Sequence, residues 1–167
     1  AHTPEALATC LQNVSDQFKN RKISIVFGCG GDRDKFKRPI MGKIANSYCD
    51  KIYLTDDNPR FESPNSIRLA IKKKINKLKL HEIPNREKAI EKAIKNLYSG
   101  EILIVAGRGH ETIQDYGNRR KFFSDKSFIL KFIKQKNKKL KKNLKLNILK
   151  EISNKSYLPA NLKIRMA

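Results

Sequence analysis

The chain has 167 residues, enough for one domain of ordinary size plus an appendage, and no run approaches the roughly 18 apolar residues of a membrane span. Its formal net charge of +21 usually indicates a nucleic acid or anionic surface as partner, but Lys far outnumbers Arg, and Asn and Ile are also abundant, a bias that the base composition of coding DNA can produce. Cys10, Cys29 and Cys49 form neither an even disulfide set nor a CxxC metal pair. We therefore expect no membrane insertion, no specific nucleic-acid partner and a reducing, cytoplasmic location.

The first predicted element is an amphipathic helix near the N-terminus. Its apolar residues, Leu7, Leu11, Val14 and Phe18, follow the helical period, and Thr3-Pro4-Glu5 supplies an N-cap, an N1 proline and an early acid. The chain starts AHTPEAL, without an initiator Met or the basic-then-apolar layout of a signal peptide, so we expect it to be a piece of a longer protein.

Short apolar strands then alternate with amphipathic helices. Strands are predicted at residues 23–27, 52–55 and 102–106, with a brief extended stretch around Glu82 and Ile83. The helices between them are marked by three apolar sets: Ile40, Met41, Ile44, Ala45 and Tyr48; Ile67, Ile71, Ile75 and Leu78 after a Ser63-Pro64 cap; and Ile90, Ala93, Ile94 and Leu97 after Asn85. This alternation predicts an α/β fold, a Rossmann-like open, mainly parallel sheet with helices on both faces.

The last third of the chain changes character. Residues 112–121 are polar and predict a hairpin or an antiparallel edge strand, and Ser124 is placed to cap a final helix. The inward face of that helix is expected to carry Phe128, Ile129, Phe132 and Ile133. We expect one domain over 1–133, a Lys-rich linker or helix end over 134–145, and a tail over 146–167.

Three polar loops follow three successive strands, at residues 28–38, 56–60 and 107–111. In open α/β sheets the ligand lies beyond the carboxyl ends of the strands, so these loops should converge on one crevice. Taken alone, each loop has a plain alternative: the glycines of GCGG permit a tight exit from a strand, His110 could bond to backbone, and Glu111 could be a solvated acid. GCGG is neither a full GxGxxG nor a P-loop.

The segment Asp57-Asn58-Pro59-Arg60 suits a site for an amino acid. Arg presents a planar fork for a carboxylate, Asp accepts from an ammonium, and Asn can do either. Pro59 fixes its own φ and pushes Asn58 toward extended geometry, so the polar side chains start partly ordered. The alternative is an ordinary strand-to-helix turn, because Asp, Asn and Pro are turn formers.

Four motifs in order, AHTP, FGCGGDRDKFKRP, TDDNPR and AGRGHE, resemble the C-terminal domain of the Mur ligases over about residues 1–133. The branch resembled adds meso-diaminopimelate to UDP-N-acetylmuramoyl-L-alanyl-D-glutamate in the cytoplasmic phase of peptidoglycan synthesis. The resemblance implies an ATP-dependent ligase that phosphorylates the D-glutamate side-chain carboxylate, after which the amine of the amino acid attacks the acyl phosphate. It also implies that ATP and Mg²⁺ are bound mainly by preceding domains. This chain alone is then expected to hold no catalytic residue and no metal site, and to bind the amino acid without catalysis.

Carried over by motif, the resemblance implies a meso-diaminopimelate site made of Arg33, Asp57, Asn58, Pro59, Arg60, Gly107 and Glu111. The two arginines can neutralise carboxylates, Glu111 can pair with the distal ammonium, and Gly107 allows close backbone approach. His2 and Thr3 fall in the motif that lies near ATP in the family. Two residues depart from the family pattern: Phe36 stands where glycine is usual, and Arg108 replaces the common lysine.

Two other functions fit parts of the sequence. A nucleotide-binding Rossmann module of another enzyme would use an acid after the second strand, Asp56 or Asp57, to hold a ribose. A basic RNA-binding or scaffolding domain would rest on charge alone. Residues 144–153, LKLNILKEIS, faintly resemble the opening of the ligase that acts next in the pathway, which implies a fusion of two ligases; the alternative is a helical or disordered extension.

Overall fold

The computed structural model describes residues 1–154, of which 147–154 are described by backbone alone. Contacts divide the chain into a first unit, residues 1–129, and a second unit that begins at Leu130. Within the described residues, no helix is long and apolar enough to cross a membrane.

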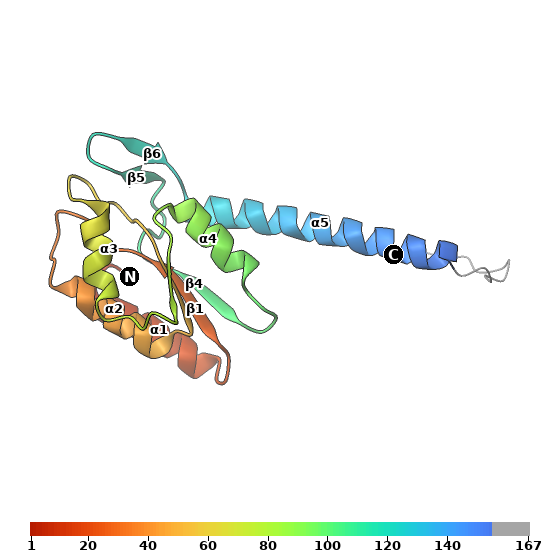
Figure 1. Cartoon of the computed structure of the whole chain (residues 1–167), viewed down its shortest axis with the longest axis horizontal. Helices are drawn as coiled ribbons and strands as arrows, with labels where there is room; N and C mark the ends of the chain where they lie inside the picture. Colours follow the sequence, from red (N-terminus) through yellow and green to blue (C-terminus); the bar gives the residue numbers. More distant parts are fainter. Residues whose placement is uncertain (155–167) are drawn as a thin grey trace. The chain divides into compact units, whose positions relative to one another are not determined.

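A four-stranded parallel sheet forms the centre of the first unit (Figure 1). Its strands are β1 (Ile23–Phe27), β2 (Lys51–Leu54), β3 (Leu80–Glu82) and β4 (Ile102–Val105). The spatial order is β3-β2-β1-β4, so the chain steps outward from β1 through β2 to β3 and then returns to the other side of β1. Connections therefore diverge between β1 and β4, and such a switch point is where open α/β sheets bind ligands at the carboxyl ends of their strands.

Helices cover both faces of the sheet, as the sequence predicts (Figure 1). They are α1 (Pro4–Gln17), α2 (Lys37–Tyr48), α3 (Pro64–Lys72) and α4 (Arg86–Lys95). One face carries α1, α2 and α3, with a core that joins Leu7 and Leu11 to alternate strand residues such as Ile25, Ile52 and Leu54. The opposite face carries α4, which contacts β1, β2 and β4. The fold is thus the predicted α/β architecture.

The helix starts follow the capping chemistry in the sequence. The Thr3 hydroxyl accepts a hydrogen bond from the Ala6 amide at 3.2 Å, the Ser63 hydroxyl accepts from the Ser66 amide, and the Asn85 side chain accepts from the Lys88 amide. Each cap satisfies a backbone donor that the first helical turn leaves unpaired.

Helix α3 is shorter than its apolar pattern predicts. The helix ends at Lys72, and Leu78, expected on its inner face, is 92% exposed. The reason is local: the Asn76 side chain accepts a hydrogen bond from the Leu78 amide at 2.9 Å, and this turn directs Leu78 to solvent. Ile75 still reaches the core.

Strands β5 (Ile113–Asp115) and β6 (Arg120–Phe122) form the predicted antiparallel hairpin. Helix α5 (Asp125–Asn154) begins in the first unit, where the Ser124 hydroxyl accepts from the Ser127 amide, and continues through the second. Helix α5 includes residues 134–145, expected as a linker or helix end, and Ile133, expected to face inward, is 41% exposed. Most of the predicted tail, residues 155–167 included, lies outside the residues whose side chains are described.

Candidate functional site

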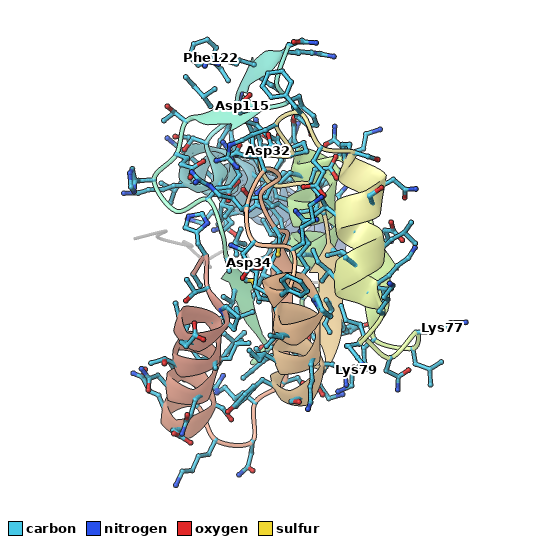
Figure 2. All side chains as sticks on the ribbon, turned by 90° about the vertical axis from the view of Figure 1, so that its left-hand side faces the viewer. Asp32, Asp34, Lys77, Lys79, Asp115 and Phe122 are labelled. Atoms are coloured by element: carbon cyan, nitrogen blue, oxygen red, sulfur yellow. The ribbon has the colours of Figure 1, made fainter. Side chains whose placement is uncertain are left out.

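A cavity of about 300 Å³ lies where the three polar loops meet. Its lining comprises His2, Gly30, Arg33, Lys37, Asp57, Asn58, Arg60 and Glu111. The loops after β1, β2 and β4 all contribute, together with the residues before α1. Asp32 precedes Arg33 in the sequence, and the Asp115 amide donates to Asn58, so both mark the position of the lining. Figure 2 shows these two residues toward one end of the domain and Lys77 and Lys79 toward the opposite end. The predicted crevice is therefore present at the carboxyl edge of the sheet.

The loop after β1 lies directly against the loop after β2. The Gly31 amide donates to the Asn58 carbonyl oxygen at 2.9 Å, and a Cβ on Gly31 would overlap the carbonyl group of Pro59. Arg60 adopts a left-handed φ of 51°, a conformation that costs a non-glycine residue free energy. Its guanidinium Nη1 donates to the Gly31 carbonyl oxygen at 2.7 Å, which ties the two loops together.

The Asn58 side chain joins the loops after β2 and β4. Its Nδ2 donates to Glu111 Oε2 at 2.6 Å, and its Oδ1 accepts from the Asp115 amide at 2.9 Å. The second carboxylate oxygen of Glu111 lies 3.9 Å from His2 Nε2. Asn58 therefore orients the Glu111 carboxylate, which remains one-third exposed at the cavity.

Asp57 is the most buried acid of the cavity lining. It is 2% exposed, its Oδ1 accepts from the Asn58 amide at 2.8 Å, and its Oδ2 has no hydrogen-bond partner among the described residues. Burial raises the pKa of this carboxyl above its ordinary value. An unpaired, buried carboxylate oxygen is costly while the carboxyl group is ionised, which agrees with the raised pKa.

Three cationic side chains line the same cavity: Arg33, Lys37 and Arg60. Arg33 is exposed and makes no hydrogen bond or ion pair within residues 1–146. Lys37, the first residue of α2, donates from Nζ to the His2 carbonyl oxygen at 2.8 Å. The cavity thus presents both signs of charge, which suits a ligand with carboxylate and ammonium groups.

Three predicted site residues are not part of the cavity lining. Thr3 caps α1, Pro59 supports the loop contact, and Gly107 packs at a φ of 105° where a Cβ would lie 2.5 Å from Asp57 Oδ2. Sequence reasoning missed Lys37 and Gly30 as lining residues, although both lie in the glycine-rich and basic motif that was singled out.

Sequence reasoning also missed the ion pair between Arg38 and Glu62, which stabilises the loop after β1. Arg38, 2% exposed, donates through both terminal nitrogens to Glu62 at 2.7 Å each, and Arg38 Nη2 also donates to the Gly30 carbonyl oxygen at 3.3 Å. The hydrogen bonds from Arg38 lower the pKa of Glu62 from 4.5 to about 2. The pair fixes the β1 loop to the segment that follows Arg60.

This pair predicts an acid-sensitive contribution to stability. The pKa of Glu62 is lower in the folded chain than in the unfolded one, so the ionised pair stabilises the fold above pH 4.5 and its contribution is lost as the pH falls toward about 2. Glu62→Gln should lower the free energy of unfolding at pH 7 by about 2 kcal/mol and flatten its decline below pH 4.5.

Urea unfolding at a series of pH values measures this effect. Glu87→Gln is the control, because Glu87 is 44% exposed and pairs with Lys121 at 3.4 Å at the surface. An acid decline equally steep in the Glu62→Gln and Glu87→Gln chains would contradict the assignment.

The acids after β2 do not fit a ribose-binding role. Asp56 accepts from Arg68 in a close ion pair and from the Tyr116 hydroxyl at 3.4 Å, so its carboxylate is already occupied. Asp57 faces the cavity with cations around it. Within the described residues, no group of three or more His, Cys, Asp or Glu side chains could hold a metal ion.

Comparisons with known proteins show the family of the chain. The sequence profile described as Mur ligase, glutamate ligase domain, matches residues 1–109. The UDP-N-acetylmuramoyl-L-alanyl-D-glutamate–2,6-diaminopimelate ligase of Rickettsia rickettsii is 47% identical over 135 residues, which are 80% of this chain and 28% of that protein. The protein of the same name from Buchnera aphidicola subsp. Baizongia pistaciae is 44% identical over 138 residues, 82% of this chain and 27% of that protein.

A solved structure of a UDP-N-acetylmuramoyl-L-alanyl-D-glutamate–2,6-diaminopimelate ligase matches the fold with a TM-score of 0.75 and 37% identity. The match covers 82% of this chain and 28% of that one. This chain therefore spans less than a third of the length of these relatives. It belongs to the Mur ligase family, of which it carries the glutamate ligase domain.

Proposed function

We propose that this chain is the amino-acid-binding part of an ATP-dependent ligase that adds meso-diaminopimelate to UDP-N-acetylmuramoyl-L-alanyl-D-glutamate in cytoplasmic peptidoglycan synthesis. The observation that carries the proposal is the cavity at the carboxyl edge of the sheet, which gathers side chains from four separate motifs. The names of relatives 44–47% identical to this chain give a ligase for the same nucleotide dipeptide and 2,6-diaminopimelate.

The charges of the cavity match the proposed ligand. meso-Diaminopimelate carries two carboxylates and two amino groups. Arg33 and Arg60 can each pair with a carboxylate, while Asp57 and Glu111 can accept from an ammonium. Glu111, one-third exposed at the cavity, is the acid that the ligand can reach directly, whereas Asp57 Oδ2 is enclosed by the protein.

In the proposed reaction, ATP phosphorylates the side-chain carboxylate of D-glutamate, which gives an acyl phosphate and ADP. The ligand's free amine then attacks the acyl carbon, the amide bond forms, and phosphate and a proton leave. This chain binds and orients the attacking amino acid, because the proposed pairs fix its carboxylates and one ammonium relative to the sheet.

ATP and Mg²⁺ are assigned to the part of the protein outside this chain. No phosphate-cradling P-loop sequence occurs in the 167 residues. His2, which lines the cavity, is proposed to lie near ATP. A reducing cytoplasmic location agrees with Cys10, Cys29 and Cys49, which are free thiols.

A thermal-shift panel tests the proposed function. The 167-residue chain is heated with meso-diaminopimelate, L-lysine, NAD or a short RNA. meso-Diaminopimelate should raise the melting temperature in a concentration-dependent way, because a ligand that binds only the folded state stabilises it. Stabilisation by NAD alone would favour the nucleotide-binding alternative, and stabilisation by RNA alone would favour the RNA-binding one.

A second expected result concerns catalysis by this chain alone. Mixed with ATP, Mg²⁺, meso-diaminopimelate and the nucleotide dipeptide, it should release no phosphate above background, because the sequence lacks a P-loop. A malachite-green phosphate assay measures this, with the full-length Rickettsia rickettsii relative as positive control. Substrate-stimulated phosphate release would contradict the division of roles.

A further inference from the structure

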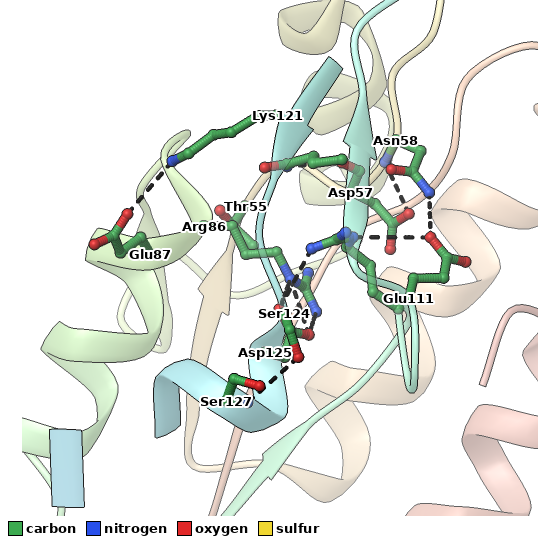
Figure 3. A network of polar contacts seen from close by, with 12 residues as sticks. Thr55, Asp57, Asn58, Arg86, Glu87, Glu111, Lys121, Ser124, Asp125 and Ser127 are labelled. Atoms are coloured by element: carbon green, nitrogen blue, oxygen red, sulfur yellow. Dashed lines mark hydrogen bonds and ion pairs between the residues drawn. The ribbon is translucent and has the colours of Figure 1, made fainter. Parts of the chain in front are cut away.

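A row of alternating charges, most of them buried, ends at a carboxylate of the cavity lining, and Figure 3 shows three of its members, Arg86, Asp125 and Glu111. Arg86 donates from Nε and Nη2 to the Asp125 carboxylate at 2.6–3.2 Å and from Nη2 to the Ala106 carbonyl oxygen at 2.8 Å. Asp125 Oδ1 also lies 3.6 Å from Arg108 Nη1. Arg108 Nε in turn lies 3.9 Å from Glu111 Oε2. The row connects the starts of α4 and α5 to a carboxylate of the cavity.

Arg108 is unusual within this row. Its side chain is fully buried, yet within the described part of the chain none of its three guanidinium nitrogens has a hydrogen-bond partner. Its guanidinium lies 5.9 Å from the centre of the Phe123 ring. Opposite charges on two sides and this ring, rather than hydrogen bonds, hold the group in place.

The shape of the side chain matters as well as its charge. Arg108 faces Asp125 with Nη1 and Glu111 with Nε, two nitrogens on different edges of one rigid plane. A lysine has a single nitrogen and cannot present two such edges. Arginine at this position can therefore act on both carboxylates at once.

We propose that Arg108 is a positioning residue for the amino-acid cavity: anchored by Asp125, it keeps the Glu111 carboxylate oriented to accept the ammonium of the diamino acid. This inference rests on the proposed function. Arg108 acts through Glu111 Oε2, the oxygen that also accepts the hydrogen bond from Asn58 Nδ2 at 2.6 Å. Two contacts restrict the carboxylate more than one, so the Glu111 side chain loses less conformational entropy when the ligand binds.

A double-mutant cycle on this chain tests the proposal, with meso-diaminopimelate affinity measured by NMR titration, which detects weak binding. Arg108→Met should lower the affinity about tenfold in the parent chain, a coupling within the usual range for interacting neighbours. In a Glu111→Gln chain the same change should alter the affinity less than twofold. Loss of packing alone would lower the affinity equally in both backgrounds.

The control is Lys121→Met. Lys121 Nζ lies over the same Phe123 ring, 5.3 Å from its centre, but pairs with Glu87 at the surface and not with the cavity. Its removal should leave the affinity unchanged. A tenfold loss in this variant would overturn the proposal, because the ring contact would then explain the Arg108 effect.

Arg108→Met should fold, because Asp125 keeps its hydrogen bonds from Arg86 and no hydrogen bond of Arg108 is lost. If its NMR spectrum shows an unfolded chain, Arg108→Lys replaces it in the cycle, with an expected loss of about threefold that Glu111→Gln again removes. A parent chain that binds, with Arg108 variants of unchanged affinity, overturns this inference alone. A parent chain that does not bind meso-diaminopimelate overturns the proposed function and this inference with it.

Discussion

meso-Diaminopimelate should bind this chain about a hundredfold more tightly than L-lysine, which shares its carbon chain but lacks the second carboxylate. With lysine bound, one of the cationic partners Arg33 and Arg60 would lack the carboxylate that it pairs with in the diaminopimelate complex. The charge-assisted hydrogen bonds that lysine cannot make contribute up to a few kcal/mol, or roughly two powers of ten in affinity.

NMR or calorimetric titration with both amino acids measures the ratio. Arg33→Ala should reduce the preference to within about tenfold, because Arg33 makes no other hydrogen bond or ion pair in the described part of the chain and can be removed without disturbing the fold. Lys35→Ala is the matched control, since Lys35 is a cation of the same loop, 3.6 Å from Glu62, that does not line the cavity. Equal affinities for the two amino acids in the parent chain would sink the proposed ligand.

Gly31→Ala should destabilise the fold by about 3 kcal/mol and abolish amino-acid binding. A Cβ at this position would overlap the Pro59 carbonyl group, which is backbone and cannot rotate away. The two loops would have to separate, and the hydrogen bond from Arg60 Nη1 to the Gly31 carbonyl oxygen would be lost with them.

Urea unfolding and meso-diaminopimelate titration measure the two effects. Gly109→Ala is the control: a Cβ there meets nothing within 4 Å, and its φ of 51° adds only the left-handed penalty, about 1 kcal/mol. A Gly31→Ala chain as stable as the Gly109→Ala chain would show that the loops tolerate separation. The contrast separates steric contact from backbone conformation, because both positions are glycines in cavity loops.

Local chemistry in the sequence was sufficient to predict most of the fold. The strand at Ile23–Phe27, the caps Thr3, Ser63 and Asn85, and the antiparallel hairpin depend on side chains within a few residues of each other. The prediction for Leu78 was wrong because the apolar pattern continues past the point where the Asn76 side chain starts a turn. The spacing of apolar residues carries no information about a side-chain hydrogen bond that competes with the helix.

The sequence by itself determined the family and predicted the residues of the proposed site, because four ordered motifs carry both. Only the tertiary structure decided which of those residues line one cavity. Asp57 and Glu111 line it, whereas Gly107 packs against Asp57 and Thr3 caps a helix. The contacts that hold the site, from Arg38 to Glu62 and from Arg108 to Asp125, join residues 24 and 17 positions apart in the chain. Spacing along the sequence does not encode such pairs, because they depend on how the strand order β3-β2-β1-β4 brings separate loops to one edge of the sheet.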